Sequence, residues 1–329
     1  MSTEVERKEQ NLAAQGSVVA SMTGVSRLTG FLRDVVLSAV LGATAGADVF
    51  FVALRIPNFF RRMFAEGAFA QAFIPVLAEY RNAADDKALQ NFVRAVCGDF
   101  GLVLVTICTL GILGASGLVL VFAPGFLDDP EKFDLTVDMV RVTLPYLAFI
   151  SLTAFAGSIL NSFQRYALPA ITPVLLNIAL IVAALIGMRF FSTPLMALAW
   201  GIFAAGLVQL IFQLPALQRL HLLSVPKIDW HDPGIRKVGR LFVPAVFAAS
   251  VGQINILVGS ILASTLVTGS ISWLYYSDRL MELPIGLLAI ALGTVLLPNL
   301  SRLRLSLIHI SEPTRRYAIS YAVFCKKKK

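Results

Sequence analysis

Two hydrophobic segments near the N-terminus carry ionisable side chains that could bind a charged ligand. The segments span residues 18–41 and 48–80, and together they hold Arg27, Arg33, Asp34, Asp48, Arg55, Arg61, Arg62 and Glu66. An ionisable group near the middle of a bilayer costs roughly 2.5–3.5 kcal/mol on insertion scales. Side chains of this kind cannot face lipid, so we expect them to line a shared polar cavity. Five arginines against three carboxylates favour an anion as the occupant.

Helical spacing places several of these charges on one face. In the second segment an ideal helix gives a polar stripe, because the members lie 7, 7 and 4 residues apart: Asp48, Arg55, Arg62 and Glu66. Arg61 points elsewhere unless a break at Pro57 turns it inward. In the first segment Arg27 and Asp34 share a face, with Arg33 adjacent. A third charged group lies near residue 280 and consists of Asp278, Arg279 and Glu282.

Arginine suits a phosphate ligand, because the guanidinium keeps its charge and offers a planar fork of donors to phosphate oxygens. The neighbouring carboxylates would compensate the empty site and supply partners to exchange when a ligand arrives. The alternative is a set of salt bridges that only tie the helices together. Asp34, Asp48 and Glu66 could neutralise three of the five arginines. The two remaining arginines favour the anion site.

The composition predicts an all-α, polytopic membrane protein. The chain is 57% hydrophobic and 15% charged, with a mean hydropathy of +0.76, whereas a soluble domain is about 25% charged. With about 20 residues per span, we expect eight transmembrane helices at residues 18–41, 48–80, 92–122, 135–163, 169–190, 194–219, 238–267 and 271–303. Prolines fall inside several spans, and neighbouring helices must bind the carbonyls that they free.

Loop charges predict the orientation in the membrane. Lysine and arginine gather in every second connection, for example at Arg81 and Lys87, at Arg165, and across residues 219–240. The positive-inside rule then places these loops and the N-terminus in the cytoplasm. Residues 1–17 lack the apolar core of a signal peptide and are expected to form a cytoplasmic leader.

The sequence offers no pattern for catalysis or for a cofactor. The longest connection between spans, residues 220–237, has no glycine-rich phosphate loop, and the three histidines are isolated. Cys97, Cys108 and Cys325 lack metal or redox spacing. We therefore expect a transporter and not an enzyme, with no metal, no cofactor and no nucleic-acid partner; a coupling ion stays open.

Residues 305–329 differ from everything before them. The segment LSLIHISEPTR resembles a translated sequencing adapter, and the lysines at the end resemble a translated poly-A stretch. We expect a non-native tail. The alternative is a genuine basic tail that binds anionic lipid.

Three motifs identify a family resemblance. The segments SRLTGFLRD at 26–34, RRMFAEGAF at 61–69 and YYSDRLMELP at 275–284 closely resemble the MurJ (MviN) lipid II flippase family, and the likeness runs from about residue 17 to residue 304. The resemblance implies a six-helix N-terminal lobe at 18–220, an inter-lobe linker at 221–237, and helices seven and eight of an incomplete second lobe at 238–304. It also implies the superfamily of multidrug, oligosaccharidyl-lipid and polysaccharide exporters.

The resemblance further implies a function in peptidoglycan biosynthesis. Lipid II, an undecaprenyl-pyrophosphate-linked disaccharide pentapeptide, would cross the bacterial inner membrane from inner to outer leaflet by alternating access. The family's cavity positions fall on Arg27, Arg33, Asp34, Asp48, Arg61, Glu66 and Arg279. Bilayer lipids and cell-wall synthesis proteins are implied partners. Two alternatives stay open: a cation-coupled multidrug or polysaccharide-lipid exporter, and a non-transporting scaffold for wall-synthesis enzymes.

Overall fold

A computed structural model describes residues 2–83, 85–223, 225–282 and 284–285. The chain divides into two compact units, Met1–Arg279 and Leu280–Lys329. The second unit is described only at 280–282 and 284–285, which are helical. The end of the eighth expected span and the expected non-native tail at 305–329 lie outside the described residues.

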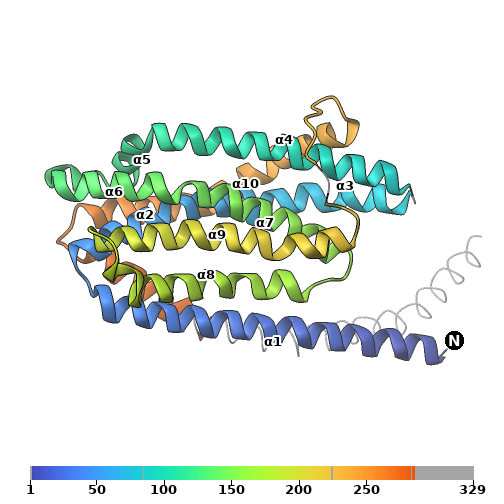
Figure 1. Ribbon diagram of the computed structural model, residues 1–329, viewed down its shortest axis with the longest axis horizontal. Helices are drawn as coiled ribbons and strands as arrows, with labels where there is room; N and C mark the ends of the chain where they lie inside the picture. The colour runs from blue at the N-terminus through green and yellow to red at the C-terminus, as the bar shows by residue number, and fades with distance from the viewer. Residues whose placement is uncertain (1, 84, 224, 283, 286–329) are drawn as a thin grey trace, which may run out of the picture. The chain divides into compact units, whose positions relative to one another are not determined.

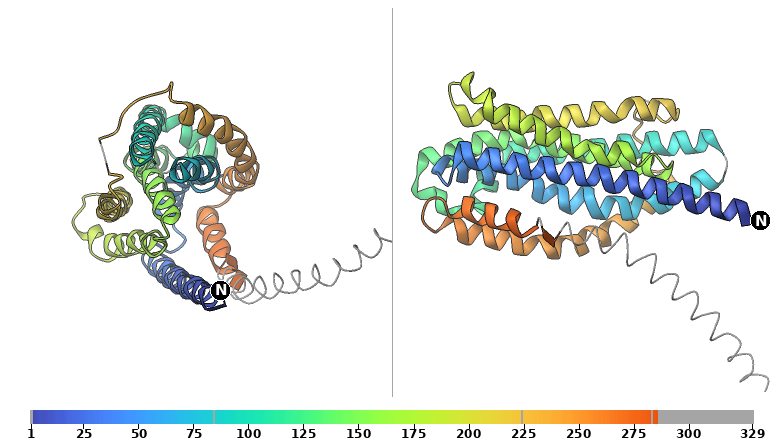
Figure 2. Two further views of the ribbon diagram at one scale, coloured as in Figure 1. Left: turned by 90° about the vertical axis from the view of Figure 1, so that its right-hand side faces the viewer. Right: turned by 90° about the horizontal axis from the view of Figure 1, so that it is seen from below.

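The first unit is a bundle of long helices, and the part of the chain that the structure describes has no strand. The helices are α1 (Ser2–Leu41), α2 (Ala45–Arg61), the π-helix η1 (Arg62–Phe69), α3 (Ala70–Asn82), α4 (Asp86–Leu113), α5 (Ala115–Phe122), η2 (Pro124–Asp128), α6 (Pro130–Thr143), α7 (Pro145–Ser162), α8 (Ala167–Leu185), η3 (Gly187–Arg189), α9 (Pro194–Arg219) and α10 (Pro233–Ser264). A further helix begins at residue 270 and continues through 282. Figures 1 and 2 show α1, α8 and α9 side by side, as their contacts require.

Five of the described helical segments are long and apolar enough to cross a membrane: Asp86–Leu113, Pro130–Ser162, Ala167–Arg189, Pro194–Arg219 and Pro233–Ser264. They correspond to the third through seventh expected spans. The protein is therefore an all-helical, multi-pass membrane protein, as predicted. The count of eight spans stays a prediction, because α1 and α2 combine membrane-like length with many charges.

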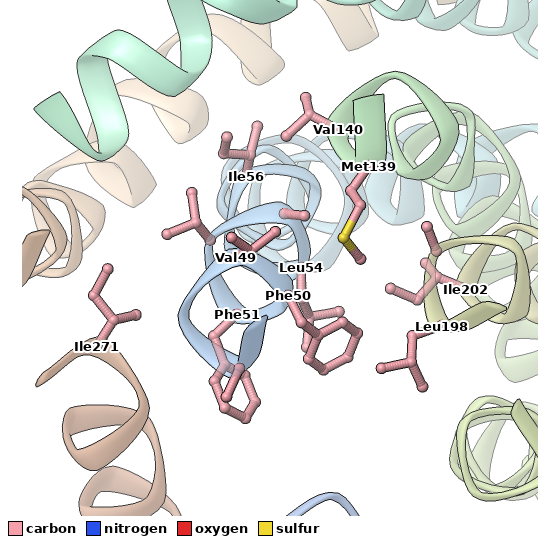
Figure 3. Close-up of a cluster of buried hydrophobic side chains, with 14 of the residues drawn as sticks. Val49, Phe50, Phe51, Leu54, Ile56, Met139, Val140, Leu198, Ile202 and Ile271 are labelled. Carbon is pink, nitrogen blue, oxygen red and sulfur yellow. The ribbon is translucent and has the colours of Figure 1, made fainter. Parts of the chain in front are cut away.

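The core surrounds the middle of α2, where residues 49–54 are apolar on every side. A helical stretch that is hydrophobic all round must be buried, and Val49, Phe50 and Phe51 are at most 1% exposed. Figure 3 shows the α2 side chains between Met139 of α6 on one side and Ile271 on another. Because this stretch of α2 is held from all directions, it fixes where the charged residues on either side of it, Asp48 and Arg55, can lie.

Pro57 lies inside α2 and has no N–H for the carbonyl of Ala53, one turn earlier. The Thr143 hydroxyl of α6 donates to that carbonyl at 3.1 Å, and both groups are buried. The expectation that neighbouring helices bind carbonyls freed by proline is confirmed at this position. The same bond ties α2 to α6.

The second expected span, 48–80, is not one regular helix. It consists of α2, η1 and α3, and η1 is a π-helix over Arg62–Phe69. A π-helix has more residues per turn than an α-helix, since its hydrogen bonds reach one residue farther. The stripe calculated for an ideal α-helix therefore does not extend through Glu66.

The connection between α9 and α10 is held against α4 by a segment that we call the strap, residues 225–232. Lys227 N donates to the Arg94 carbonyl at 3.1 Å, and Asp229 N donates to Asp99 Oδ1 at 3.0 Å. A side chain at Gly98 would overlap the Lys227 carbonyl, so glycine permits the close approach. The hydrogen bond and charge of Lys227 lower the pKa of Asp229, and the two side chains form an ion pair at 2.8 Å.

Candidate functional site

Asp34 is the centre of a charged network between α1 and the helix at 270–282. Its Oδ1 accepts from Arg33 Nε at 2.9 Å, from Arg33 Nη2 at 2.7 Å and from Tyr275 Oη at 3.1 Å. Its Oδ2 lies 3.9 Å from Arg279 Nε. Asp34 is only 8% exposed, so one buried carboxylate joins two arginines that are far apart in the sequence.

Arg33 has partners on three helices. Besides Asp34, its Nη1 donates to Asn177 Oδ1 of α8 at 3.0 Å, and its Nη2 donates to Tyr275 Oη at 3.3 Å. The guanidinium is therefore fixed in direction by groups from several elements.

Tyr275 owes its position to aromatic packing. Its ring stacks on Phe51 of α2 with centroids 4.0 Å apart, and its neighbour Tyr276 meets Phe51 edge-on at 5.3 Å. The Arg279 guanidinium lies over the Tyr275 ring at 5.2 Å from the centroid, a cation–π geometry. The buried core of α2 thus sets the place of the Tyr275 hydroxyl and of Arg279.

Three more arginines lie along α2 and the start of η1. Arg55 is attracted electrostatically by Asp278 and repelled by Arg279 and Arg62, and its buried Nη1 has no hydrogen-bond partner within the described part of the chain. Arg61 donates from Nε to Asn58 at 3.0 Å and is repelled by the same two arginines. These arginines therefore repel one another and form one group of positive charge.

We call this group the arginine cluster; its members are Arg33, Asp34, Arg55, Arg61, Arg62, Asp278 and Arg279. Its named members among the described residues are five guanidinium groups and two carboxylates. Gathering like charges is costly where water is scarce. A polyanion with forked oxygen acceptors would lower that cost, which is the chemistry that the cluster can perform.

Asp48 was expected on the polar stripe, but the structure gives it other partners. Its carboxylate accepts from Gly269 N at 2.7 Å, from Ser272 N at 3.0 Å and from Ser272 Oγ at 2.7 Å. Lys132 Nζ lies 3.5 Å away. Asp48 therefore caps the first turn of the helix at 270–282, and these bonds do not include the arginine cluster.

The other expected site residues are placed as follows. Arg27 is exposed on α1, as is Asp278, a member of the arginine cluster, on the helix at 270–282. Glu66 lies in η1, but its side chain is outside the part of the structure that is described. Glu282 belongs to the second unit. The structure therefore brings together most of the predicted arginines and only part of the predicted carboxylates.

Sequence reasoning missed Asn177 and Tyr275 because both are neutral. A signal did exist for each. Asn177 is the only amide in α8, whose other residues are apolar except for Thr172, and Tyr275 lies one helical turn before Arg279. Among the described residues, no group of three or more His, Cys, Asp or Glu side chains could hold a metal ion.

Comparisons with known proteins agree on one family. The family model described as lipid II flippase MurJ matches residues 37–306. A probable lipid II flippase MurJ of Vibrio cholerae is 47% identical over 301 residues, which cover 89% of this chain and 57% of the relative. The lipid II flippase MurJ of Burkholderia cenocepacia is 40% identical over 304 residues, covering 91% and 58%. The chain thus spans little more than half the length of these relatives.

Solved structures give the same result for the fold. A structure titled lipid II flippase MurJ, inward closed conformation, has a TM-score of 0.71 at 27% identity and covers 87% of this chain and 59% of the other. A structure titled crystal structure of MATE in complex with MaD3S has a TM-score of 0.60 at 15% identity and covers 86% of this chain and 63% of the other. The second likeness concerns the fold alone.

Proposed function

The chain belongs to the lipid II flippase MurJ family, and we propose that it supplies the diphosphate-binding part of a lipid II transporter. The supporting observation is the arginine cluster, in which Arg33 and Arg279 meet around one buried carboxylate. The proposed substrate is undecaprenyl-pyrophosphate-linked peptidoglycan precursor. The activity is transport and not catalysis.

In this proposal the arginines bind the two phosphates of the lipid. A guanidinium presents two parallel N–H groups to phosphate oxygens, and such charge-assisted bonds are roughly twice as strong as neutral ones. The bonds are stronger still where protein replaces water. The excess of positive charge in the cluster provides the attraction, while the prenyl tail stays in the surrounding lipid.

Asp34 supports an exchange mechanism. In the absence of ligand its carboxylate occupies the fork of Arg33 and also faces Arg279. A diphosphate that binds Arg33 must displace Asp34 from that fork. Arg33 lies in the expected N-terminal lobe (18–220) and Arg279 in the expected second lobe (238–304), so this exchange would change a contact between lobes. Alternating access requires such a change in contact.

The same proposal includes the orientation and the energy source. The N-terminus and the 221–237 linker lie in the cytoplasm, and transport runs toward the outer leaflet of the inner membrane. The cycle uses no cofactor and draws on the membrane potential or an ion gradient, where one charge is worth about 2.3 kcal/mol per 100 mV. Because the chain covers 57% of its Vibrio cholerae relative, the complete cycle requires the remaining part of such a protein.

Growth rescue tests this function. A chimera joins residues 1–304 of this chain to the C-terminal part of the Vibrio cholerae relative and is expressed in a bacterium depleted of its own flippase. We expect the chimera to restore growth and Arg33→Ala to abolish the rescue. The control is Arg141→Ala, which removes an exposed arginine paired with Asp138. Full rescue by Arg33→Ala would refute the proposal.

A further inference from the structure

Among the residues that the structure describes, Arg33 is held by one charged partner and two neutral ones. Its Nε and Nη2 donate to Asp34, its Nη2 also donates to Tyr275 Oη, and its Nη1 donates to Asn177 Oδ1. These bonds use four of the five N–H donors of a guanidinium. Of these bonds, only those to Asp34 involve a negative charge. An incoming anion could therefore replace Asp34 and leave the two neutral partners in place.

The orientation of the Asn177 amide is determined by its surroundings. Its Nδ2 donates to the Ser26 carbonyl at 3.3 Å and lies 3.2 Å from Thr29 Oγ1. The Thr29 hydroxyl donates its own hydrogen to a backbone carbonyl of α1, so it accepts a hydrogen bond from Asn177. The amide oxygen must then face Arg33. Asn177 is 5% exposed, and a flipped amide would leave two acceptors facing each other.

Tyr275 holds Arg33 from the other side. Its hydroxyl accepts from Arg33 Nη2 and donates to Asp34 Oδ1, which uses both functions of the group. The ring is 8% exposed and stacked on Phe51 of the buried α2. The hydroxyl therefore has little freedom to follow Asp34 if that carboxylate moves.

A diphosphate competes with the Asp34 carboxylate for the fork of Arg33, because both are anions. Asn177 and Tyr275 are neutral, so the diphosphate does not replace them in the same way. We propose that Asn177 and Tyr275 are positioning residues that keep Arg33 in place while its fork changes partner from Asp34 to the diphosphate. The inference rests on the proposed function and deepens it. It assigns roles to two residues that do not need to touch the ligand.

The test measures binding of inorganic pyrophosphate to the full 329-residue chain in phosphatidylcholine nanodiscs by isothermal titration calorimetry. A bond to a charged group is lost in Asn177→Ala and in Tyr275→Phe, so we expect each to weaken binding about tenfold. Tyr276→Phe is the control for Tyr275, because its hydroxyl donates to the Gly42 carbonyl instead. Asn161→Ala is the control for a surface amide. Neither control should change the affinity.

A double-mutant cycle separates positioning from general support of the fold. Arg33→Lys keeps the charge but loses the fork. In that background Asn177→Ala should weaken binding less than twofold, because the group on which it acts is gone. Fully additive effects would overturn the inference, as would wild-type affinity in both Asn177→Ala and Tyr275→Phe.

The substitution Asn177→Asp gives a further test, because a residue that only supports the fold would not be expected to change pyrophosphate affinity through its charge. It gives Arg33 a second carboxylate, so pyrophosphate should bind more weakly than to Asn177→Ala; wild-type affinity in Asn177→Asp would contradict the proposal. If Asn177→Ala does not fold, Tyr275→Phe retains the stacked ring and carries the test. If the unaltered chain binds no pyrophosphate, the proposed function itself fails. If it binds but the cycle is additive, only the positioning inference fails.

Discussion

Replacing Asp34 with asparagine should change stability and ligand affinity in opposite directions. The asparagine keeps nearly the same shape but removes the one carboxylate bonded to Arg33 among the residues that the structure describes. It also removes the partner of Arg279 at 3.9 Å. Two arginines are then left without their shared counter-ion, while the competitor of an anionic ligand is gone.

The structure sets the size of both effects. Charges at the Asp34–Arg279 separation interact by about 4 kcal/mol at an effective dielectric constant near 20. Removing one partner of a buried pair costs about 3–5 kcal/mol. Because the Arg279 side chain is 36% exposed, we expect the lower end, about 3 kcal/mol of unfolding free energy. Losing the competitor should tighten pyrophosphate binding by about tenfold, the equivalent of one charge-assisted hydrogen bond.

The assay combines thermal unfolding with calorimetric titration of pyrophosphate in nanodiscs. Asp138→Asn is the matched control, since it removes an exposed carboxylate paired with Arg141 at 3.0 Å. Such surface pairs contribute at most about 1 kcal/mol. Weaker pyrophosphate binding in Asp34→Asn would refute the exchange mechanism, because it would mean that the carboxylate helps the anion to bind.

Two further substitutions probe the supports of the site. Asp48→Ala removes the cap at residues 269–272 and leaves Lys132 unpaired, so we expect a loss of about 3 kcal/mol in unfolding free energy; Asp48→Asn should lose less, because asparagine also caps helices. Equal losses in chemical denaturation would contradict the cap assignment. Gly98→Ala should displace the strap and speed proteolysis within residues 225–232, whereas Gly101→Ala, with open space around its Cβ, should not. Unchanged cleavage in Gly98→Ala would show that the strap does not depend on this close approach.

The membrane class, the family and the meeting of arginines were predictable from the sequence. The cost of charge in lipid requires ionisable side chains on apolar helices to gather, and Arg33, Asp34 and Arg279 do so. The resemblance to the MurJ family is confirmed by the family match. The sequence also predicted that a neighbouring helix would bind the carbonyl freed by Pro57, although it did not identify Thr143 as the donor.

The role of Asp48 could not be obtained from spacing. Helical periodicity gives the face on which a side chain lies, but not the partner that it meets. Here the partners are backbone and hydroxyl groups of residues 269–272, more than 220 positions later in the chain. The π-helix η1 also changes the register after Arg61. Asn177 and Tyr275 were missed because a search for charge does not find the neutral groups that orient it.

Comparative binding of two lipids tests the central claim most directly. Undecaprenyl pyrophosphate and undecaprenol share the prenyl tail and differ in the diphosphate, and both can be titrated against the chain in nanodiscs by native mass spectrometry. We predict at least about a hundredfold preference for the pyrophosphate, the value of two charge-assisted bonds. The preference should disappear when Arg33→Gln and Arg279→Gln are combined. Equal affinity for the two lipids, or a preference that survives the double substitution, would contradict an arginine cluster that binds diphosphate.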